Sequence, residues 1–391
     1  MYERQRQTTV SCKGAARAVS RRGRLVRSLF FLALLLTLTA CARGGVTPSA
    51  FGGGSGTESD PYLIATEAHL RDIAAAPHLY KGKHFLQTAD IRLNGPWRPI
   101  GHSSYFRECE FAGRFDGNGH TITGLTLKTS PDYLGLFGMI RFDGEVRNLT
   151  VETSPEGISL DDDNYARAGI IAVFSDGVIE NCITRGRLAD GGFLGGIVAQ
   201  NRGIVKNCIN YAAIEAYSDN SALAGGIAGT NSGMRGPFNS RRDRRDPSPE
   251  AQISRCTNHG QVTSLAAFTA SAGGITADNM WGTIEDSFNK GLVSAKGSSY
   301  HTFAGGVVGD NGASISRCLN TGAVSASGGI SQVDGTRGPA FAGGLVGNNR
   351  GRIADSRSAV DATAKGGAPS AHGVVAGDTP GKVDNCGKLR Q

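Results

Sequence analysis

The sequence predicts an all-β fold, a parallel β-helix, on the strength of three observations. Glycine accounts for 57 of the 391 residues, which is about twice its usual share. A short phrase recurs from about residue 135 to the end of the chain. The sequence has no heptad pattern, no strict Gly-X-Y period and no apolar run of 18 residues. These absences exclude a coiled coil, collagen and a transmembrane bundle.

The recurring phrase combines a glycine-rich strand, an Asn/Gly turn, and then an aliphatic residue, two polar residues and a small one. Its last part stands at Ile179–Cys182, Val205–Cys208, Ile253–Cys256, Ile284–Ser287, Ile315–Cys318, Ile353–Ser356 and Val383–Cys386. The small residues that end these copies lie 26 to 48 residues apart. The shorter spacings suit one coil of a solenoid. The alternative is a β-sandwich, whose strands would not repeat one phrase at this period.

The spacing inside one copy predicts how a coil is built. Cys318, Asn320 and Val324 keep the parity of a strand, whereas Ile315 lies three residues before Cys318. If both face inward, a corner or bulge separates them. We therefore expect three short strands per coil, with corners between them and a rise of about 4.8 Å between coils. The extra residues 234–252 and 328–340 are expected on corners.

One helix is expected, at the N-terminal end of the repeats. The segment 66–74 begins with Thr66, a good N-cap, and places Leu70, Ile73 and Ala74 on one face. The end coil of a solenoid needs a cover. This helix is therefore predicted to cap the first coil.

A leader precedes the repeats. Residues 29–38 form an apolar core of ten residues behind a basic stretch, and ten helical residues span only about 15 Å, too little for a bilayer. The ending Leu38-Thr39-Ala40-Cys41 resembles the lipobox of bacterial lipoproteins. The resemblance implies that Cys41 carries the lipid and, with Ala42 after it, that the protein goes to the outer membrane. An ordinary signal peptide with a chance cysteine is the alternative.

The predicted organisation has four parts. Residues 1–40 are a lipoprotein signal peptide, and residues 41–56 are the lipidated Cys and a flexible Gly-rich tether. Residues 57–134 hold the N-terminal cap and the first coils, and residues 135–391 hold the repeats. The formal net charge of +7 comes from the leader, because residues 1–40 contain eight bases and one acid. The remaining chain is balanced, which argues against nucleic acid as a partner.

The phrase resembles the bacterial GLUG-repeat family, on Gly135-Leu136-Phe137-Gly138 and on the run Phe111–Ile122, which contains Phe-Asp-Gly-Asn-Gly-His. The resemblance covers roughly residues 57–390. It implies a right-handed β-helix, a bacterial surface location and occurrence in adhesin-like proteins. The family also occurs beside the metallopeptidase domain of immunoglobulin A proteases. Later copies here depart from the motif, because Gly-Gly replaces Gly-Leu.

Five cysteines share one repeat position, which is Ser at 287 and 356 and Leu at 149. A position that accepts all three types suits a small buried side chain, so we expect a column of stacked thiols. A disulfide between Cys182 and Cys208, or between Cys208 and Cys256, is one alternative, and metal ligation is another. Cys109 lies outside this column.

No catalytic, cofactor-binding or metal-ligating residue is predicted. The sequence has no His-Glu-x-x-His and no Cys-x₂-Cys, and Asp161–Asp163 lacks the spacing of a calcium loop. We find no column of acids at one repeat position. Asp286 and Asp355 share their repeat position with Asn and Arg. This variety indicates an exposed wall that tolerates many residue types.

We therefore expect a non-catalytic cell-surface lipoprotein, an adhesin-like or ligand-binding module held to the membrane by its lipid. The candidate binding residues are on the corner insertion, namely Arg241, Arg242, Arg244 and Arg245. They would favour anionic glycans or acidic surface proteins. Taken alone, however, the charge cluster favours a solvated loop over a binding site. Two alternatives stay open for the chain: a carbohydrate-active β-helix enzyme (polysaccharide lyase or glycosidase) and a structural spacer of the envelope.

Overall fold

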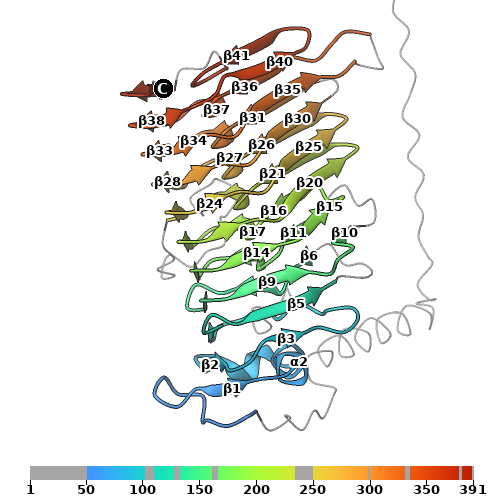
Figure 1. Cartoon of the computed structure of the whole chain (residues 1–391), viewed down its shortest axis with the longest axis vertical. Coiled ribbons are helices and arrows are strands. Elements are labelled where there is room, and N and C mark those ends of the chain that lie inside the picture. The colour runs from blue at the N-terminus through green and yellow to red at the C-terminus, as the bar shows by residue number, and fades with distance from the viewer. Residues whose placement is uncertain are drawn as a thin grey trace, which may run out of the picture. The chain divides into compact units, whose positions relative to one another are not determined.

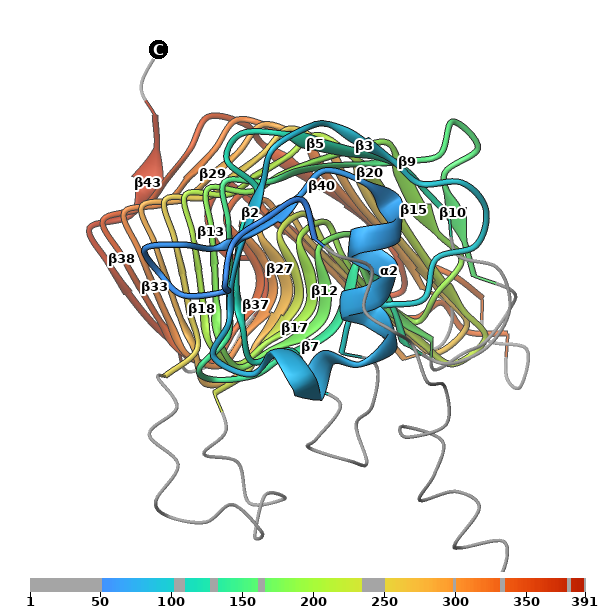
Figure 2. The ribbon, with the colours of Figure 1, turned by 90° about the horizontal axis from the view of Figure 1, so that it is seen from below.

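The fold was analysed in a computed structural model, which describes residues 51–101, 110–126, 133–160, 166–233, 250–297, 300–330, 335–377 and 381–389. The chain divides into two compact units, Met1–Gly45 and Val46–Gln391, and all described residues belong to the second. In this unit, short strands stack coil upon coil into five parallel sheets (Figures 1 and 2). The predicted parallel β-helix is confirmed. We number the sheets 1 to 5 in the order in which the chain passes through them in one complete coil.

Sheets 1 and 2 form two consecutive walls of every coil. Sheet 1 contains β1 (Tyr62–Ile64), β2 (His84–Gln87), β4 (Arg114–Asp116), β8 (Glu145–Arg147), β13 (Val178–Glu180), β18 (Ile204–Lys206), β23 (Gln252–Ser254), β28 (Thr283–Glu285), β33 (Ser314–Ser316), β38 (Arg352–Ala354) and β42 (Lys382–Asp384). Sheet 2 contains β3 (Ile91–Arg92), β5 (Thr121–Leu125), β9 (Thr150–Thr153), β14 (Ile183–Arg185), β19 (Ile209–Asn210), β24 (Thr257–Asn258), β29 (Phe288–Asn289), β34 (Leu319–Asn320), β39 (Arg357–Ser358) and β43 (Gly387–Lys388).

Sheets 3, 4 and 5 complete the coil. Sheet 3 contains β10 (Ile158–Ser159), β15 (Arg187–Ala189), β20 (Ala213–Ser218), β25 (Val262–Ala266), β30 (Val293–Gly297), β35 (Val324–Gly328) and β40 (Ala362–Lys365). Sheet 4 contains β6 (Tyr133–Leu134), β11 (Arg167–Gly169), β16 (Phe193–Gly195), β21 (Ser221–Gly225), β26 (Thr269–Gly273), β31 (His301–Gly305), β36 (Ala340–Gly343) and β41 (Pro369–His372). Sheet 5 contains β7 (Phe137–Ile140), β12 (Ala172–Ser175), β17 (Val198–Asn201), β22 (Ala228–Asn231), β27 (Thr276–Asn279), β32 (Val308–Asn311) and β37 (Val346–Asn349).

A complete coil therefore has five strands, and the expectation of three was wrong. Strands of sheets 1 and 2 are only two to five residues long, so they carry almost no alternation that sequence analysis could detect. The predicted insertions 234–252 and 328–340 fall between strands, except that Gln252, Gly328 and Ala340 belong to strands. Residues 234–249 fall between β22 and β23, where sheet 5 passes to sheet 1, and residues 329–339 join β35 to β36.

A left-handed residue makes the corner between sheets 1 and 2. Ile315 and Cys318 are both buried, and Arg317 between them has φ of +51°, so the predicted corner is confirmed. Eight residues at this position have φ between +48° and +56°: Asn148, Asn181, Asn207, Arg255, Asp286, Arg317, Asp355 and Asn385. Asn and Asp tolerate this conformation better than other non-glycine residues. The column is largely exposed, as expected, but the expectation that any residue type is tolerated there was wrong, because the positive φ restricts it.

The residue after this corner forms the predicted column of small buried side chains. Cys182, Cys208 and Cys256 have no exposed surface, and Ser287 and Ser356 continue the column. Each of these thiols donates to the carbonyl two residues before it, at 3.3 Å between sulfur and oxygen. Burial raises the pKa of the Cys208 and Cys256 thiols well above the usual range. The described cysteines are free thiols, and Cys109 lies outside the described residues.

Two buried asparagine ladders run along the stack. In sheet 2, Asn210, Asn258, Asn289 and Asn320 form a chain of amide hydrogen bonds, each 2.8 Å from nitrogen to oxygen. In sheet 5, Asn201, Asn231, Asn279, Asn311 and Asn349 form a second chain, at 2.7 to 2.9 Å. A buried amide is tolerated only when its donors and acceptors are satisfied. The ladders therefore favour one register between neighbouring coils.

The Gly-Gly pairs make room for the sheet 2 ladder. A Cβ on Gly226 would lie 2.4 Å from Cγ of Asn258, and a Cβ on Gly274 would lie 2.3 Å from Cγ of Asn289. Ile170 holds the equivalent position one coil before Gly196, where Thr184 starts the ladder in place of Asn. The replacement of Gly-Leu by Gly-Gly therefore accompanies the asparagines.

The predicted capping helix is present. Helix α2 (Glu67–Ala75) begins at Thr66, whose hydroxyl accepts from the His69 N–H, and the 3₁₀ helix η1 (Pro77–Tyr80) follows it. Leu70, Ile73 and Ala74 are buried. Figure 2 shows α2 across the N-terminal end of the stack, so the helix covers the first coil as expected.

Candidate functional site

The predicted site residues Cys41, Arg241, Arg242, Arg244 and Arg245 lie outside the residues that the structure describes, as does Asp161–Asp163. Their neighbours in the sequence can still be placed. The insertion that carries the arginines leaves the stack after Gly233 and returns at Glu250. In the next coil, Met280 and Trp281 occupy the corresponding corner and are 41% and 48% exposed. An exposed tryptophan thus lies close to the base of the insertion, because a Cβ on Gly233 would be 3.0 Å from the Trp281 carbonyl oxygen.

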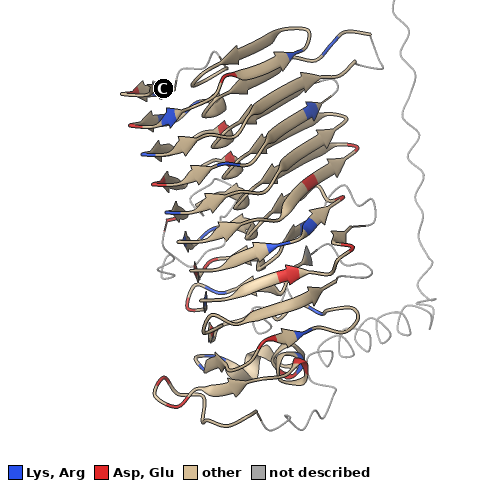
Figure 3. Cartoon of the chain, viewed as in Figure 1, with Lys and Arg blue, Asp and Glu red and all other residues tan. Residues whose placement is uncertain are grey.

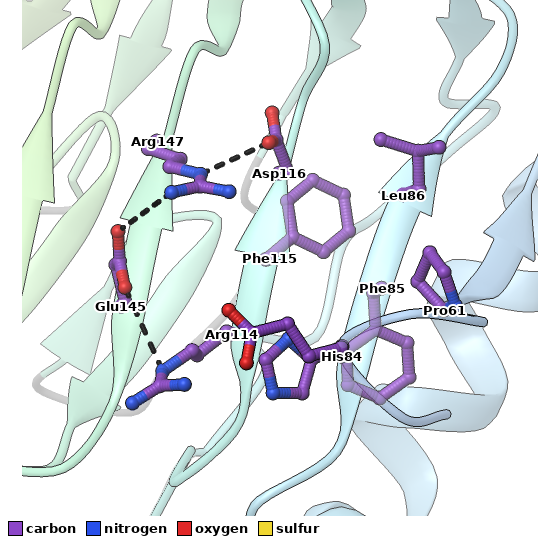
Figure 4. A pocket seen from close by; sticks show the side chains of 10 residues that line it. Pro61, His84, Phe85, Leu86, Arg114, Phe115, Asp116, Glu145 and Arg147 are labelled. Atoms are coloured by element: carbon purple, nitrogen blue, oxygen red, sulfur yellow. Dashed lines mark hydrogen bonds and ion pairs between the residues drawn. The ribbon is translucent and has the colours of Figure 1, made fainter.

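A pocket of about 280 Å³ opens on the outer side of sheet 1, in the first coils (Figure 4). Four of its charged side chains pair with one another: Arg147 lies 2.9 Å from Asp116 and 3.5 Å from Glu145, and Arg114 lies 3.7 Å from Glu145. Burial disfavours the ionised form of Asp116, but hydrogen bonds from Asn148, the Asn118 N–H and Arg147 outweigh it and lower the pKa. These mutually neutralised groups indicate a structural network.

A different arrangement occupies the outer side of sheet 5. Thr230, Asp278, Asp310 and Asn348 are partners in register on successive strands. Asp310 is held by Arg350, 2.6 Å from nitrogen to oxygen, and accepts from the Asn348 amide at 2.9 Å. Asp278 is different, because its Oδ1 atom is buried and has no hydrogen-bond partner among the described residues. The Thr230 hydroxyl, on the paired strand, is also buried and also has no hydrogen-bond partner among the described residues.

From the sequence alone, no column of acids was found at one repeat position, and this pair was not identified. Asp278 and Asp310 stand in the same phrase, as Thr276-Ala-Asp278-Asn279 and Val308-Gly-Asp310-Asn311. The repeats are aligned most clearly at the Cys/Ser position, and the position of Asp278 and Asp310 is not evident from that alignment. The asparagine that follows each acid is a ladder residue, which is the signal that could have aligned them.

Burial and mutual repulsion disfavour two charges at this place. Burial, and then the charge of Asp310, raise the pKa of Asp278 to about 7, although Arg350 acts in the opposite direction. Burial also raises the pKa of Asp310, against the effects of Arg350, Asn348 and His301. A nearby carboxylate commonly raises the pKa of a carboxyl group in this way. Asp278 is therefore mostly protonated below pH 7 and mostly ionised above it.

Among the described residues, no group of three or more His, Cys, Asp or Glu side chains is arranged to hold a metal ion. In the same part of the chain, no helix has the length and apolar character needed to cross a bilayer.

Comparisons with known proteins give short or distant similarities. No family model matches the chain. A "Putative Gly-rich membrane protein" of Evansella cellulosilytica is 40% identical over 138 residues, 31% of this chain and 15% of that protein. "Halomucin" of Haloquadratum walsbyi is 29% identical over 156 residues, 37% of this chain and 2% of that protein. The chain thus spans a small part of the relatives it matches.

Among solved structures, the chain is similar to a "putative immunoglobulin A1 protease" from Bacteroides ovatus. The TM-score is 0.46 and the sequence identity is 20%, with 87% of this chain and 78% of the other covered.

Proposed function

We propose that the chain is a non-catalytic, lipid-anchored surface module of the GLUG-repeat type, whose β-helix presents a ligand-binding corner. Cys41 carries the lipid, and the body is attached to the bacterial envelope at the outer membrane. The description of one relative as a membrane protein supports an envelope location. Mass spectrometry of protein from native membranes would detect an acylated Cys41 as the new N-terminus, and an unmodified Cys41 would contradict the anchor.

The observation that carries the binding role is the corner between sheets 5 and 1. There the insertion 234–249, with Arg241, Arg242, Arg244 and Arg245, leaves the stack close to Trp281, which is 48% exposed. Arginine and tryptophan are enriched among residues that dominate binding energy at interfaces. The coils themselves repeat one another, so a feature that occurs in a single coil is the better candidate for selective contact.

Deletion of the insertion tests this role. We expect that replacing residues 236–250 by a Gly-Ser turn in the full chain leaves the unfolding midpoint unchanged, because loop length costs little free energy when the ends are close. Binding to acidic glycans on an array should fall strongly. A Trp281→Ala variant should show a smaller loss of the same binding, whereas Leu79→Ala, an exposed residue on η1, serves as the control. Unchanged glycan binding after the deletion would reject this corner and favour a spacer.

A second candidate function has one observation in its favour, the Asp278–Asp310 pair. Glycosidases use one protonated and one ionised carboxyl flanking the bond that they cleave. With a coil rise of about 4.8 Å, the backbone positions of the two residues are spaced much like the carboxyl groups of retaining glycosidases, which are about 5 Å apart. Asp278 would be the acid and Asp310 the ionised partner. Recovery of shortened oligosaccharides would favour this carbohydrate-active enzyme.

A further inference from the structure

A column of cationic and aromatic side chains lies on the outer side of sheet 2. Arg185, Tyr211, His259 and Lys290 occupy equivalent positions at the ends of β14, β19, β24 and β29, as the pairing of these strands shows. Arg185, Tyr211 and Lys290 are exposed, and His259 is partly buried. We call these four residues the basic column. It lies on a different wall from the Arg-rich insertion.

The members of the basic column contact one another from coil to coil. The guanidinium carbon of Arg185 lies 4.6 Å from the centre of the Tyr211 ring. The rings of Tyr211 and His259 stack with centroids 4.6 Å apart and planes 19° apart. Because Arg185 comes from the preceding coil and His259 from the following one, they cover opposite faces of the tyrosine ring. Burial, and then the charge of Lys290, lower the pKa of His259.

The cations of the basic column, unlike many others on the surface, lack acidic partners among the described residues. Figure 3 shows both signs of charge along the stack, and arginines such as Arg147, Arg187 and Arg317 form ion pairs with carboxylates of neighbouring coils. Arg185 and Lys290 form no ion pair with any described carboxylate. Glu152 is the strand partner of Arg185, yet the two do not come within ion-pair distance. Exposed cations without acidic partners give this wall a positive potential, so an external anion would be attracted to it.

We propose that the basic column binds an acidic polysaccharide that runs along the stack, with its carboxylate or sulfate groups near Arg185 and Lys290. This inference rests on the proposed binding function and names a second contact surface for it. The two cations are three coils apart, about 14 Å at a rise of about 4.8 Å per coil, so they contact separate anionic groups of an extended chain.

The ring geometry favours a polysaccharide over a single-stranded nucleic acid. Proteins that bind single strands stack the bases on open aromatic faces. Both faces of Tyr211 are occupied by Arg185 and His259, so no base can stack there. Charge recognition of carboxylate or sulfate needs only the cationic groups.

The test measures binding of the full chain to immobilised polygalacturonate as salt is raised. In the double variant Arg185→Gln/Lys290→Gln we expect the dissociation constant to rise about tenfold, which is about 1.4 kcal/mol, with a weaker dependence on salt. The matched control is Arg352→Gln/Lys388→Gln. It removes the same charge from residues that are paired with Asp384 and Asp361, and we expect a much smaller change.

Three outcomes would contradict the inference. Equal affinities of the two double variants, with unchanged unfolding midpoints, would overturn the basic column but leave the proposed binding function in place. Failure of the wild-type chain to bind any polysaccharide, acidic or neutral, would overturn both. Displacement of polygalacturonate by a lower concentration of single-stranded oligonucleotide would assign the column to nucleic acid instead.

Discussion

Replacement of Asn289 by alanine is expected to destabilise the protein by more than about 4 kcal/mol, because buried polar groups left without partners cost about 1 to 3 kcal/mol each. Asn289 takes part in four hydrogen bonds. Its carbonyl oxygen accepts from the amide of Asn258 and the N–H of Gly291, and its amide donates to Asn320 and the Gly291 carbonyl. All four partners would lose a bond inside the stack. Urea unfolding followed by circular dichroism measures the loss.

The neighbouring residue provides the control for this prediction. Lys290 is exposed, and an exposed substitution such as Lys290→Ala usually changes stability by less than about 0.5 kcal/mol. Asn289→Ser should be intermediate, because serine already fills the ladder position at 358, where it donates to the carbonyl of Val360. Equal stabilities of the Asn289→Ala and Lys290→Ala variants would show that the ladder does not hold the coils together.

Substitution of Asp278 by asparagine is expected to stabilise the protein above pH 7 and to leave it unchanged below about pH 4. The pKa of Asp278 in the folded chain is about 7, above its usual value of 3.8. Between these two values the folded form holds a proton that the unfolded form has released. Protonation of Asp278 therefore stabilises the folded chain at low pH, and this stabilisation is lost as the pH rises to 7.

The size of this effect follows from the pKa difference. Each unit is worth about 1.4 kcal/mol, so the Asp278→Asn variant should exceed the wild type by a few kcal/mol at pH 8. The experiment is urea unfolding of both chains between pH 4 and pH 8.5. Asp143→Asn is a useful control, because ion pairing with Arg141 outweighs burial and lowers the pKa of Asp143, so this variant should lose stability at neutral pH. Parallel wild-type and Asp278→Asn curves would contradict the raised pKa of Asp278.

The capping helix was predicted from its own N-cap and apolar face, whereas the repeated phrase was enough to predict the parallel stack, the corner between Ile315 and Cys318 and the buried thiol column. These features depend on contacts between equivalent residues, which repetition makes visible. The five-strand coil was not predictable in the same way. A strand of two residues, such as β29, has no measurable period, and its limits are set by the corners and by the strands stacked on either side.

Two other features, the left-handed corner and the burial of Asp278, depend on backbone conformation and on packing between coils, which no single copy of the repeat reveals. The asparagines at the left-handed corner were misinterpreted because Arg255 and Arg317 share that position, and only the positive φ explains the preference. The burial of Asp278 depends on its outer surroundings on sheet 5, where Asp310 is its neighbour only after the coils have stacked. The candidate arginines and Cys41 lie outside the described residues, so their roles stay predictions.

The proposed role as a non-catalytic binding module is tested most directly by the fate of one bound glycan. The full wild-type chain would be titrated with a fluorescent acidic oligosaccharide, and the glycan would then be recovered after prolonged incubation for mass spectrometry. The account predicts saturable binding that weakens with salt, and a recovered glycan of unchanged mass. A shortened or unsaturated product that disappears in the Asp278→Asn variant would contradict it and establish the enzyme, and the absence of any saturable binding would contradict the binding role itself.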